Sequence, residues 1–134
     1  MTVTDVMQVE LVAADRLVWS GEATMVIART TEGDVGILPN HAPMLSTMVD
    51  GIVDVRTGQG ETWVAAVDAG FLSVAKNRVS ILSEHAEMSH DIDLEKARAD
   101  LERCHAEGAY EDDARAAVEK AWAEARIRAA ESAS

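Results

Sequence analysis

The stretch GIVDVRTGQGETWVAAV, residues 51–67, is typical of two short strands joined by a tight loop. GIVDVR and TWVAAV are apolar, valine-rich segments of strand length. Between them, Gly58 and Gly60 of TGQG are residues that readily take the positive φ values of a hairpin loop. The stretch therefore predicts a β-hairpin, the unit from which antiparallel sheets are built.

Similar strand segments, bounded by turn residues, continue on both sides of this hairpin. Upstream, MQVELVA (7–13) alternates apolar and polar residues, and ATMVIAR (23–29) is apolar on both faces, as in a central strand. Downstream, FLSVA and RVSIL flank Lys76 and Asn77, and asparagine tolerates the left-handed conformation of a tight turn. This spacing predicts an antiparallel β-sandwich or flattened barrel. No alternation of strands and helices points to a doubly wound nucleotide-binding sheet.

The pattern changes near residue 90, where we expect an N-terminal domain (1–88) to give way to a C-terminal helical hairpin (89–134). In residues 91–107, Asp91 or Asp93 is placed to cap a helix. The apolar stripe of this first helix comprises Leu94, Ala97, Leu101 and Cys104. The apolar face of the second helix (111–132) comprises Ala114, Val118, Ala121, Trp122, Ala125 and Ala129. Alanine favours helix but buries little area, so the hairpin should dock weakly.

Composition excludes several kinds of function. The formal charge of −12 argues against binding to nucleic acid or anionic lipid, because phosphate recognition needs clustered Lys and Arg. A single cysteine and four histidines without helical pairing predict no metal site. Neither a secretory signal nor a membrane-spanning segment is evident, so we expect a soluble, cytoplasmic chain.

The stretch EGDVGILPNHAPML, residues 32–45, holds both prolines of the chain and permits two interpretations. In the first, His41 is a catalytic base and Asp34 its partner. In the second, glycines make a turn, prolines stiffen the backbone, and His41 holds the loop through hydrogen bonds. No nucleophile elbow, P-loop or GxGxxG pattern accompanies the histidine, which favours a structural joint or an interface.

Two other features have unremarkable explanations. The three tryptophans (Trp19, Trp63 and Trp122) lie in strand or helix patterns, which favours core packing over ligand stacking. The charge runs 84–87 and 111–113 are expected to be solvated faces or helix starts, and the cations of the last helix to pair with acids on the same helix.

At this point the sequence resembles a known family. Four segments are similar to the epsilon subunit of bacterial F-type ATP synthases, with residues typical of its actinobacterial members. They are VELVAADRLVWSGEA (9–23), EGDVGILPNHAPML (32–45), DGIVDVR (50–56) and AVDAGFLSVAKNRVSILSEHAE (66–87). The most specific element is G-x-x-G-I-L-P-x-H-x-P, Gly33 to Pro43. The resemblance covers nearly the whole chain and implies a β-sandwich of about ten strands followed by an α-helical hairpin.

The resemblance also implies a function without catalytic residues. Epsilon subunits belong to the central stalk, join the gamma subunit to the ring of c subunits, and couple proton translocation to ATP synthesis. The complex holds them as peripheral proteins at the cytoplasmic face of the cell membrane. The residues matching the interface with gamma and the c ring are Glu32, Gly33, Asp34 and His41.

The helical hairpin carries the regulatory activity of this family. Folded down, it lies against the sandwich; extended, it reaches the alpha/beta head and inhibits ATP hydrolysis. A weak seam suits such a switch, because a small docking energy lets both states be populated. Four cations of the second helix are candidates for contacts with acidic segments of the beta subunits, chosen by residue type and location: Arg115, Lys120, Arg126 and Arg128.

Some members bind ATP through an I/L-D-x-x-R-A motif at the start of the first helix, and ATP would then be a regulatory ligand and not a cofactor. The matching residues are Ile92, Asp93, Lys96 and Ala97, with Arg103 as a further basic residue. Lysine in place of the motif arginine keeps the charge but loses the planar fork that binds phosphate bidentately. Two alternatives to the rotor subunit stay open: a free-standing adaptor with a mobile helical arm, and a small hydrolase using His41 and Asp34.

Overall fold

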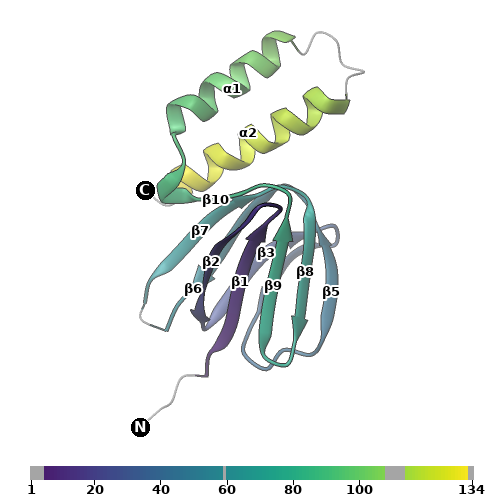
Figure 1. Cartoon of the computed structure of the whole chain (residues 1–134), viewed down its shortest axis with the longest axis vertical. Helices are drawn as coiled ribbons and strands as arrows, with labels where there is room; N and C mark the ends of the chain where they lie inside the picture. Colours follow the sequence, from purple (N-terminus) through teal and green to yellow (C-terminus); the bar gives the residue numbers. More distant parts are fainter. Residues whose placement is uncertain (1–4, 59, 108–113, 133–134) are drawn as a thin grey trace.

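The computed structural model describes residues 5–58, 60–107 and 114–132. In this part of the chain, ten strands precede a short 3-10 helix and two α-helices (Figure 1). The elements are β1 (Met7–Ala13), β2 (Arg16–Ala23), β3 (Met25–Thr30), β4 (Gly33–Ile37), β5 (Met44–Met48), β6 (Gly51–Arg56), β7 (Thr62–Val67), β8 (Gly70–Ala75), β9 (Arg78–Ser83), β10 (Ala86–Met88), η1 (Ser89–Asp91), α1 (Leu94–Glu107) and α2 (Ala114–Ser132).

The strands pair in the order β10-β7-β6-β3-β5-β8-β9-β1-β2, and β4 pairs with β3. A single register pair, Thr30 with Met48, links β3 to β5, so the ladder divides there into two halves that face each other. All pairs are antiparallel except β1 with β9, which run parallel. The expected β-sandwich followed by two helices is confirmed, with one parallel pair that the sequence pattern did not predict.

Two predicted turns can be compared with the structure. The hairpin of residues 51–67 is present, with Gly51 opposite Val67 and Arg56 opposite Thr62. Of its glycines, Gly60 has φ 83°, as predicted, whereas Gly58 is not among the positive-φ residues. Between β8 and β9, Lys76 and Asn77 have φ 52° and 61°, as a two-residue type I′ turn requires.

The sandwich core follows from the alternation of side chains along the strands. On β1, Met7, Val9, Leu11 and Ala13 are all buried, as their spacing predicted, and they pack against inward side chains of the opposite half. Trp19 and Trp63 are half-buried against this core, with ring centroids 6.4 Å apart, which confirms a packing role for both. β7 departs from alternation because both of its faces are covered, one by the core and one by α2.

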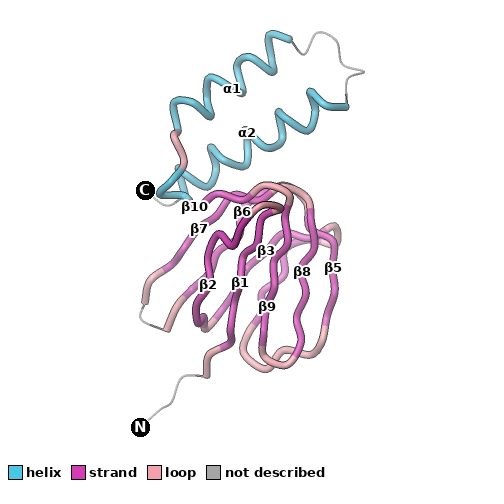
Figure 2. Tube along the Cα trace, in the orientation of Figure 1, coloured by secondary structure: helices cyan, strands magenta, loops and turns pink. Residues whose placement is uncertain are grey.

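The helical hairpin adds two further layers (Figures 1 and 2). α2 lies on the outer face of β6 and β7, and α1 lies on the side of α2 away from the sandwich. The seam between α2 and the sandwich is built from Val64, Ala66, Ala125 and Ala129, flanked by half-buried Ile52, Ile92 and Trp122. It is therefore a narrow contact made largely of alanine.

The prediction that Val118 belongs to the apolar face of α2 is wrong. Val118 is 59% exposed, because its part of the helix passes over a hollow of about 400 Å³ instead of the sheet.

At the start of α1, Asp93 accepts a hydrogen bond from the Lys96 amide at 3.1 Å, so Asp93, not Asp91, caps this helix.

Candidate functional site: interaction surfaces and a helix seam

Glu32, Gly33 and Asp34, the residues expected at the c ring, lie in the turn after β3 and at the start of β4. The Thr30 hydroxyl donates to the Gly33 carbonyl at 2.8 Å and accepts from the Glu32 amide at 3.1 Å. Gly33 has φ 115°, a value that L side chains rarely adopt. Asp34 forms an exposed ion pair with Arg29 at 3.1 Å. These bonds fix the shape of a turn that presents two carboxylates to solvent.

The loop after β4 is held by hydrogen bonds, as the structural interpretation of His41 predicted. The His41 amide donates to the Leu38 carbonyl at 3.2 Å, and its Nδ1 lies 2.7 Å from the Ala42 carbonyl oxygen. The Asn77 side chain accepts from the Asn40 amide at 2.8 Å and donates to the Val6 carbonyl at 2.7 Å. The β8–β9 turn thus anchors the loop that contains His41.

The hydrolase alternative requires His41 and Asp34 to act together. In the described part of the chain no hydrogen bond or ion pair joins them, because Asp34 binds Arg29 and the His41 ring binds the neighbouring carbonyl. The catalytic interpretation therefore has no geometric support.

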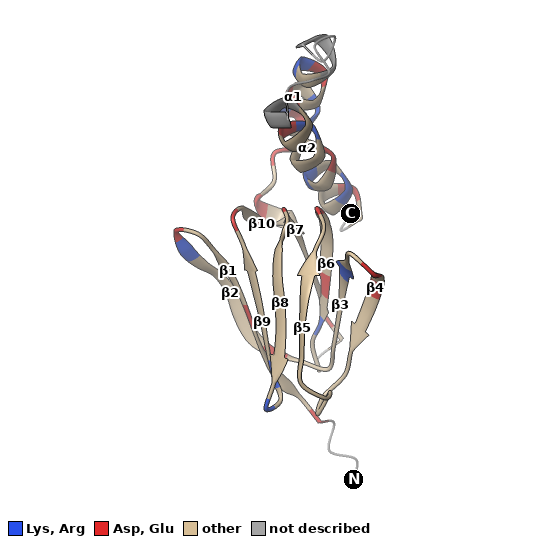
Figure 3. Ribbon diagram, turned by 90° about the vertical axis from the view of Figure 1, so that its right-hand side faces the viewer, with Lys and Arg blue, Asp and Glu red and all other residues tan. Residues whose placement is uncertain are grey.

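The outer face of β5, β8, β9, β1 and β2 carries an exposed apolar row, in which Leu45, Phe71, Leu82 and Leu17 are exposed and Val12 is half-buried. Phe71 lies opposite Leu82, Leu82 opposite Val12, and Val12 opposite Leu17. Leu45 is 73% exposed, and Leu17, Phe71 and Leu82 are 56%, 52% and 45% exposed. In Figure 3, β5 and β8 carry no charged residue. The row is continuous from Phe71 to Leu17, while Leu45 lies opposite Ser73 of β8. Exposed apolar surface of this kind marks a site of protein contact.

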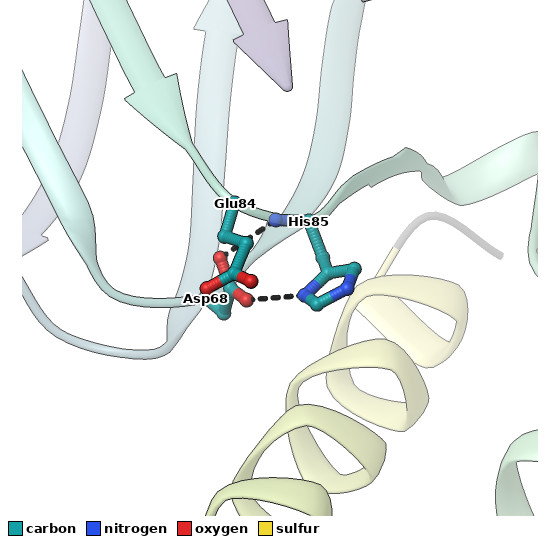
Figure 4. A group of neighbouring side chains, drawn as sticks. All are labelled: Asp68, Glu84 and His85. Carbon is teal, nitrogen blue, oxygen red and sulfur yellow. Dashed lines mark hydrogen bonds and ion pairs between the residues drawn. The ribbon is translucent and has the colours of Figure 1, made fainter. Parts of the chain in front are cut away.

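Next to α2, a polar network forms where two sandwich turns meet (Figure 4). Asp68 follows β7, and its carboxylate accepts from the Ser83 hydroxyl, from the His85 amide at 2.9 Å and from the His85 ring at 2.6 Å. The Asp68 side chain is only 9% exposed. The hydrogen bond with Asp68 raises the pKa of His85 above its ordinary value.

This network also touches the hairpin. The His85 ring lies 5.7 Å from the Trp122 ring of α2, measured between centroids. One potential metal-ligand atom from each of Asp68, Glu84 and His85 lies within 4.8 Å of the other two. However, both carboxylate oxygens of Asp68 already accept hydrogen bonds, which argues against a metal ion here. Nearby, burial raises the pKa of Asp50, although that carboxyl accepts a hydrogen bond from the Ala69 amide. Of the predicted solvated run 84–87, Glu84 and His85 are exposed as expected, whereas Ala86 is buried in the sandwich core and Glu87 is partly buried, so the prediction is partly wrong.

Arg126 is buried between the layers, which corrects its expected pairing with acids on its own helix. Its side chain is 9% exposed. Its Nη1 donates to Asp100 of α1 at 3.1 Å, and its Nε lies 3.4 Å from a carboxylate oxygen of Glu87 on β10. Sequence spacing did not reveal either partner, because both lie on other elements.

The other cations predicted for beta lie elsewhere. Lys120 and Arg128 are exposed, and Arg128 lines a cavity of about 210 Å³ together with Arg29, Asp34 and Asp54. The side chain of Arg115 falls outside the described part of the structure, as does the charge run 111–113.

The residues of the ATP motif lie around the first turns of α1. Ile92 packs on the seam cluster, Asp93 caps the helix, and Ala97 is fully buried. Lys96 is exposed, and Arg103 forms an ion pair with Asp100 at 3.1 Å. Asp93 and Arg103 therefore already have protein partners.

Comparison with known proteins gives consistent relatives. The family model described as "ATP synthase, Delta/Epsilon chain, beta-sandwich domain" matches residues 6–89. The ATP synthase epsilon chain of Streptomyces avermitilis is 54% identical over 112 residues, covering 84% of this chain and 90% of that one. The epsilon chain of Rhodococcus opacus is 52% identical over 96 residues, covering 71% of this chain and 79% of that one.

A solved structure shares the fold. A chain of the Euglena gracilis mitochondrial ATP synthase, in a complex containing OSCP, F1 and the c-ring, has a TM-score of 0.76 at 22% identity, covering 99% of this chain and 84% of that one. At this identity the likeness concerns the fold alone. Within the described residues, no helix is long and apolar enough to cross a bilayer.

Proposed function

Because the chain belongs to the ATP synthase epsilon-chain family, we propose that it is a rotor subunit that joins gamma to the c ring and couples proton translocation to ATP synthesis. It acts without catalytic residues of its own. The complex holds it at the cytoplasmic face of the membrane. Residues 1–88 serve as the coupling domain, and residues 89–134 as a regulatory arm.

The observation that carries this proposal is the exposed apolar row. Its members are large side chains on the outside of a finished sandwich, where they contribute nothing to the core. Because each is already partly covered, a partner that buries the exposed part stabilises the complex by about 1 kcal/mol per side chain, roughly half the value for a fully exposed one. A flat sheet face with an apolar centre fits a permanent partner, and we assign it to gamma.

The turn of Glu32, Gly33 and Asp34 is assigned to the c ring, with His41 at the edge of the same interface. Both segments are braced by hydrogen bonds from neighbouring elements, Thr30 for the turn and Asn77 for the loop. A braced backbone suits a joint that must transmit torque without yielding.

The hairpin is assigned the role of an arm that inhibits ATP hydrolysis when it extends to the alpha/beta head. Its seam of small side chains supports easy release. Lys120 and Arg128 are exposed while the arm is docked, whereas Arg126 is not. ATP is assigned no part in this switch, because Lys96 lacks the guanidinium fork.

Assembly with gamma tests the coupling role. Phe71→Asp places a charge in the apolar row without touching the core, so co-purification with gamma should fall by at least about tenfold. Val118→Asp is the matched control, because Val118 is equally exposed but lies on α2. Unchanged binding of the Phe71 variant would refute the assigned face. If the unmodified chain bound no ATP synthase subunit, the free-standing adaptor would be favoured.

ATP hydrolysis by the head complex tests the arm. A chain truncated after Met88 should give faster hydrolysis than the full chain if the hairpin inhibits. The truncated chain must still bind gamma and keep its β-sheet circular dichroism, which also tests the proposed domain division. Equal rates with intact binding would leave the chain as a coupling joint only.

A further inference from the structure

Arg126 occupies the middle of a three-layer stack. It lies on α2, and its two carboxylate partners come from the layers on either side: Asp100 from α1 and Glu87 from β10. The distances are 3.1 and 3.4 Å. In the described part of the chain, no other arginine is joined by charge to both α1 and the sandwich.

The burial of these groups makes their contacts interdependent. The Arg126 side chain is 9% exposed, Asp100 22% and Glu87 30%, whereas the cross-helix pair of Arg98 and Glu131 is 57% and 53% exposed. The buried Nε of Arg126 makes no hydrogen bond, despite its ion-pair distance to Glu87. A buried guanidinium that loses one carboxylate keeps its full charge with less compensation, so its environment becomes unfavourable as a whole.

We propose that Arg126 couples the two seams of the hairpin, so that loosening α2 from the sandwich also loosens α1 from α2. The docked arm then opens as one cooperative unit. Arg126 becomes available to the carboxylates of a partner only after its ion pairs with Glu87 and Asp100 break. This last step rests on the proposed inhibitory role, whereas the coupling does not.

The coupling is tested in the isolated full-length chain, with one reporter for each seam. Cys104, the single cysteine, is buried on α1, so its rate of labelling by a thiol reagent reports on the α1–α2 seam. A fluorine resonance from 5-fluorotryptophan at position 122, assigned with Trp122→Phe, reports on the seam between α2 and the sandwich.

A substitution in one seam is expected to alter the reporter of the other seam, which we call a crossed effect. Glu87→Gln, a change on β10, should raise the labelling rate of Cys104 at least about fivefold, the smallest factor expected when a buried charged partner is removed. Asp100→Asn, a change on α1, should shift the Trp122 resonance toward that of the released state. Arg98→Gln is the matched control, because it breaks an exposed cross-helix pair and should alter neither reporter by more than about twofold. Effects confined to the substituted seam would overturn the proposal.

A double-mutant cycle gives a second measurement. The effects of Glu87→Gln and Asp100→Asn on Cys104 labelling should be non-additive while Arg126 is present. In an Arg126→Met background they should become additive, because methionine fills much of the same space without charge. If the methionine variant does not fold, the crossed reporters still decide the matter. Additive effects in the unmodified background would overturn the coupling.

The head complex separates this inference from the proposed function. Glu87→Gln should strengthen inhibition of ATP hydrolysis, because it frees the arm and leaves Arg126 intact. Arg126→Gln frees the arm but removes a contact, so inhibition should be weaker than with Glu87→Gln. Crossed effects in the isolated chain with unchanged hydrolysis would support the coupling and overturn the inhibitory role.

Discussion

Replacing Ala125 with leucine should release the hairpin from the sandwich. Ala125 is 0% exposed and faces Val64 and Ala66 across the seam. The methyl groups of Ala125 and Ala129 together contribute about 1.6 kcal/mol to docking, at the value for a buried CH₂ group. Forcing a larger side chain into such a close contact costs about 1–3 kcal/mol. A penalty of about 2 kcal/mol changes the ratio of docked to released hairpin about thirtyfold.

The assay is amide hydrogen exchange in the isolated chain. Exchange should accelerate for the amides of α2 and for those of β6 and β7, the strands that α2 covers. The amides of β1, β8 and β9 should keep their protection because the sandwich core is unchanged. Ala117→Leu is the control: it makes the same substitution on the same helix at an exposed position, and should change exchange little. In the head complex, the Ala125 variant should also inhibit hydrolysis more strongly.

Two outcomes would refute this reasoning. Unchanged exchange in α2 would mean that the seam accommodates a leucine, so it is not the close alanine contact described above. Equal loss of protection across all strands would mean that the hairpin and the sandwich unfold as one unit. A separately released arm could not then be part of the mechanism.

Two further predictions concern the sandwich. A Cβ at Gly70 would overlap the carbonyl oxygen of Leu82 on β9, so Gly70→Ala should lower the free energy of unfolding by about 1–3 kcal/mol, measured with urea. The raised pKa of His85 means that its stabilising contribution is complete below its ordinary value of about 6.5 and is lost as pH rises through the raised value. From pH 6 upward, the free energy of unfolding of the unmodified chain should therefore fall more steeply with pH than that of the His85→Gln variant. Equal pH slopes for the two proteins would show that the His85–Asp68 contact does not contribute to the pH dependence of stability.

Local patterns predicted most of the sandwich. The β6–β7 hairpin and the Lys76–Asn77 turn depend on residues close in sequence, so their strand alternation and turn residues were enough. The core face of β1 followed from the two-residue period of a strand. The parallel pairing of β1 with β9 joins segments about seventy residues apart, and no local signal specifies it.

The seam was harder to predict because its residues depend on tertiary contacts. Arg126 looked like an ordinary surface cation, since nothing in its neighbourhood on α2 indicates Glu87 or Asp100. Asp68 and His85 meet only because two sandwich turns lie side by side. The five-residue continuous apolar run in β7, WVAAV, was the one available signal that a second layer covers that strand.

The exposed apolar row has a consequence for the life of the chain before assembly. A newly made copy of the chain that has not met a partner displays Leu45, Phe71 and Leu82 to solvent, and chaperones and proteases bind exposed apolar surfaces. On the proposed assignment of this face to gamma, assembly hides the row, so the same residues that bind the partner also distinguish a surplus copy from an assembled one. We therefore expect surplus copies of this chain to be degraded faster than assembled ones.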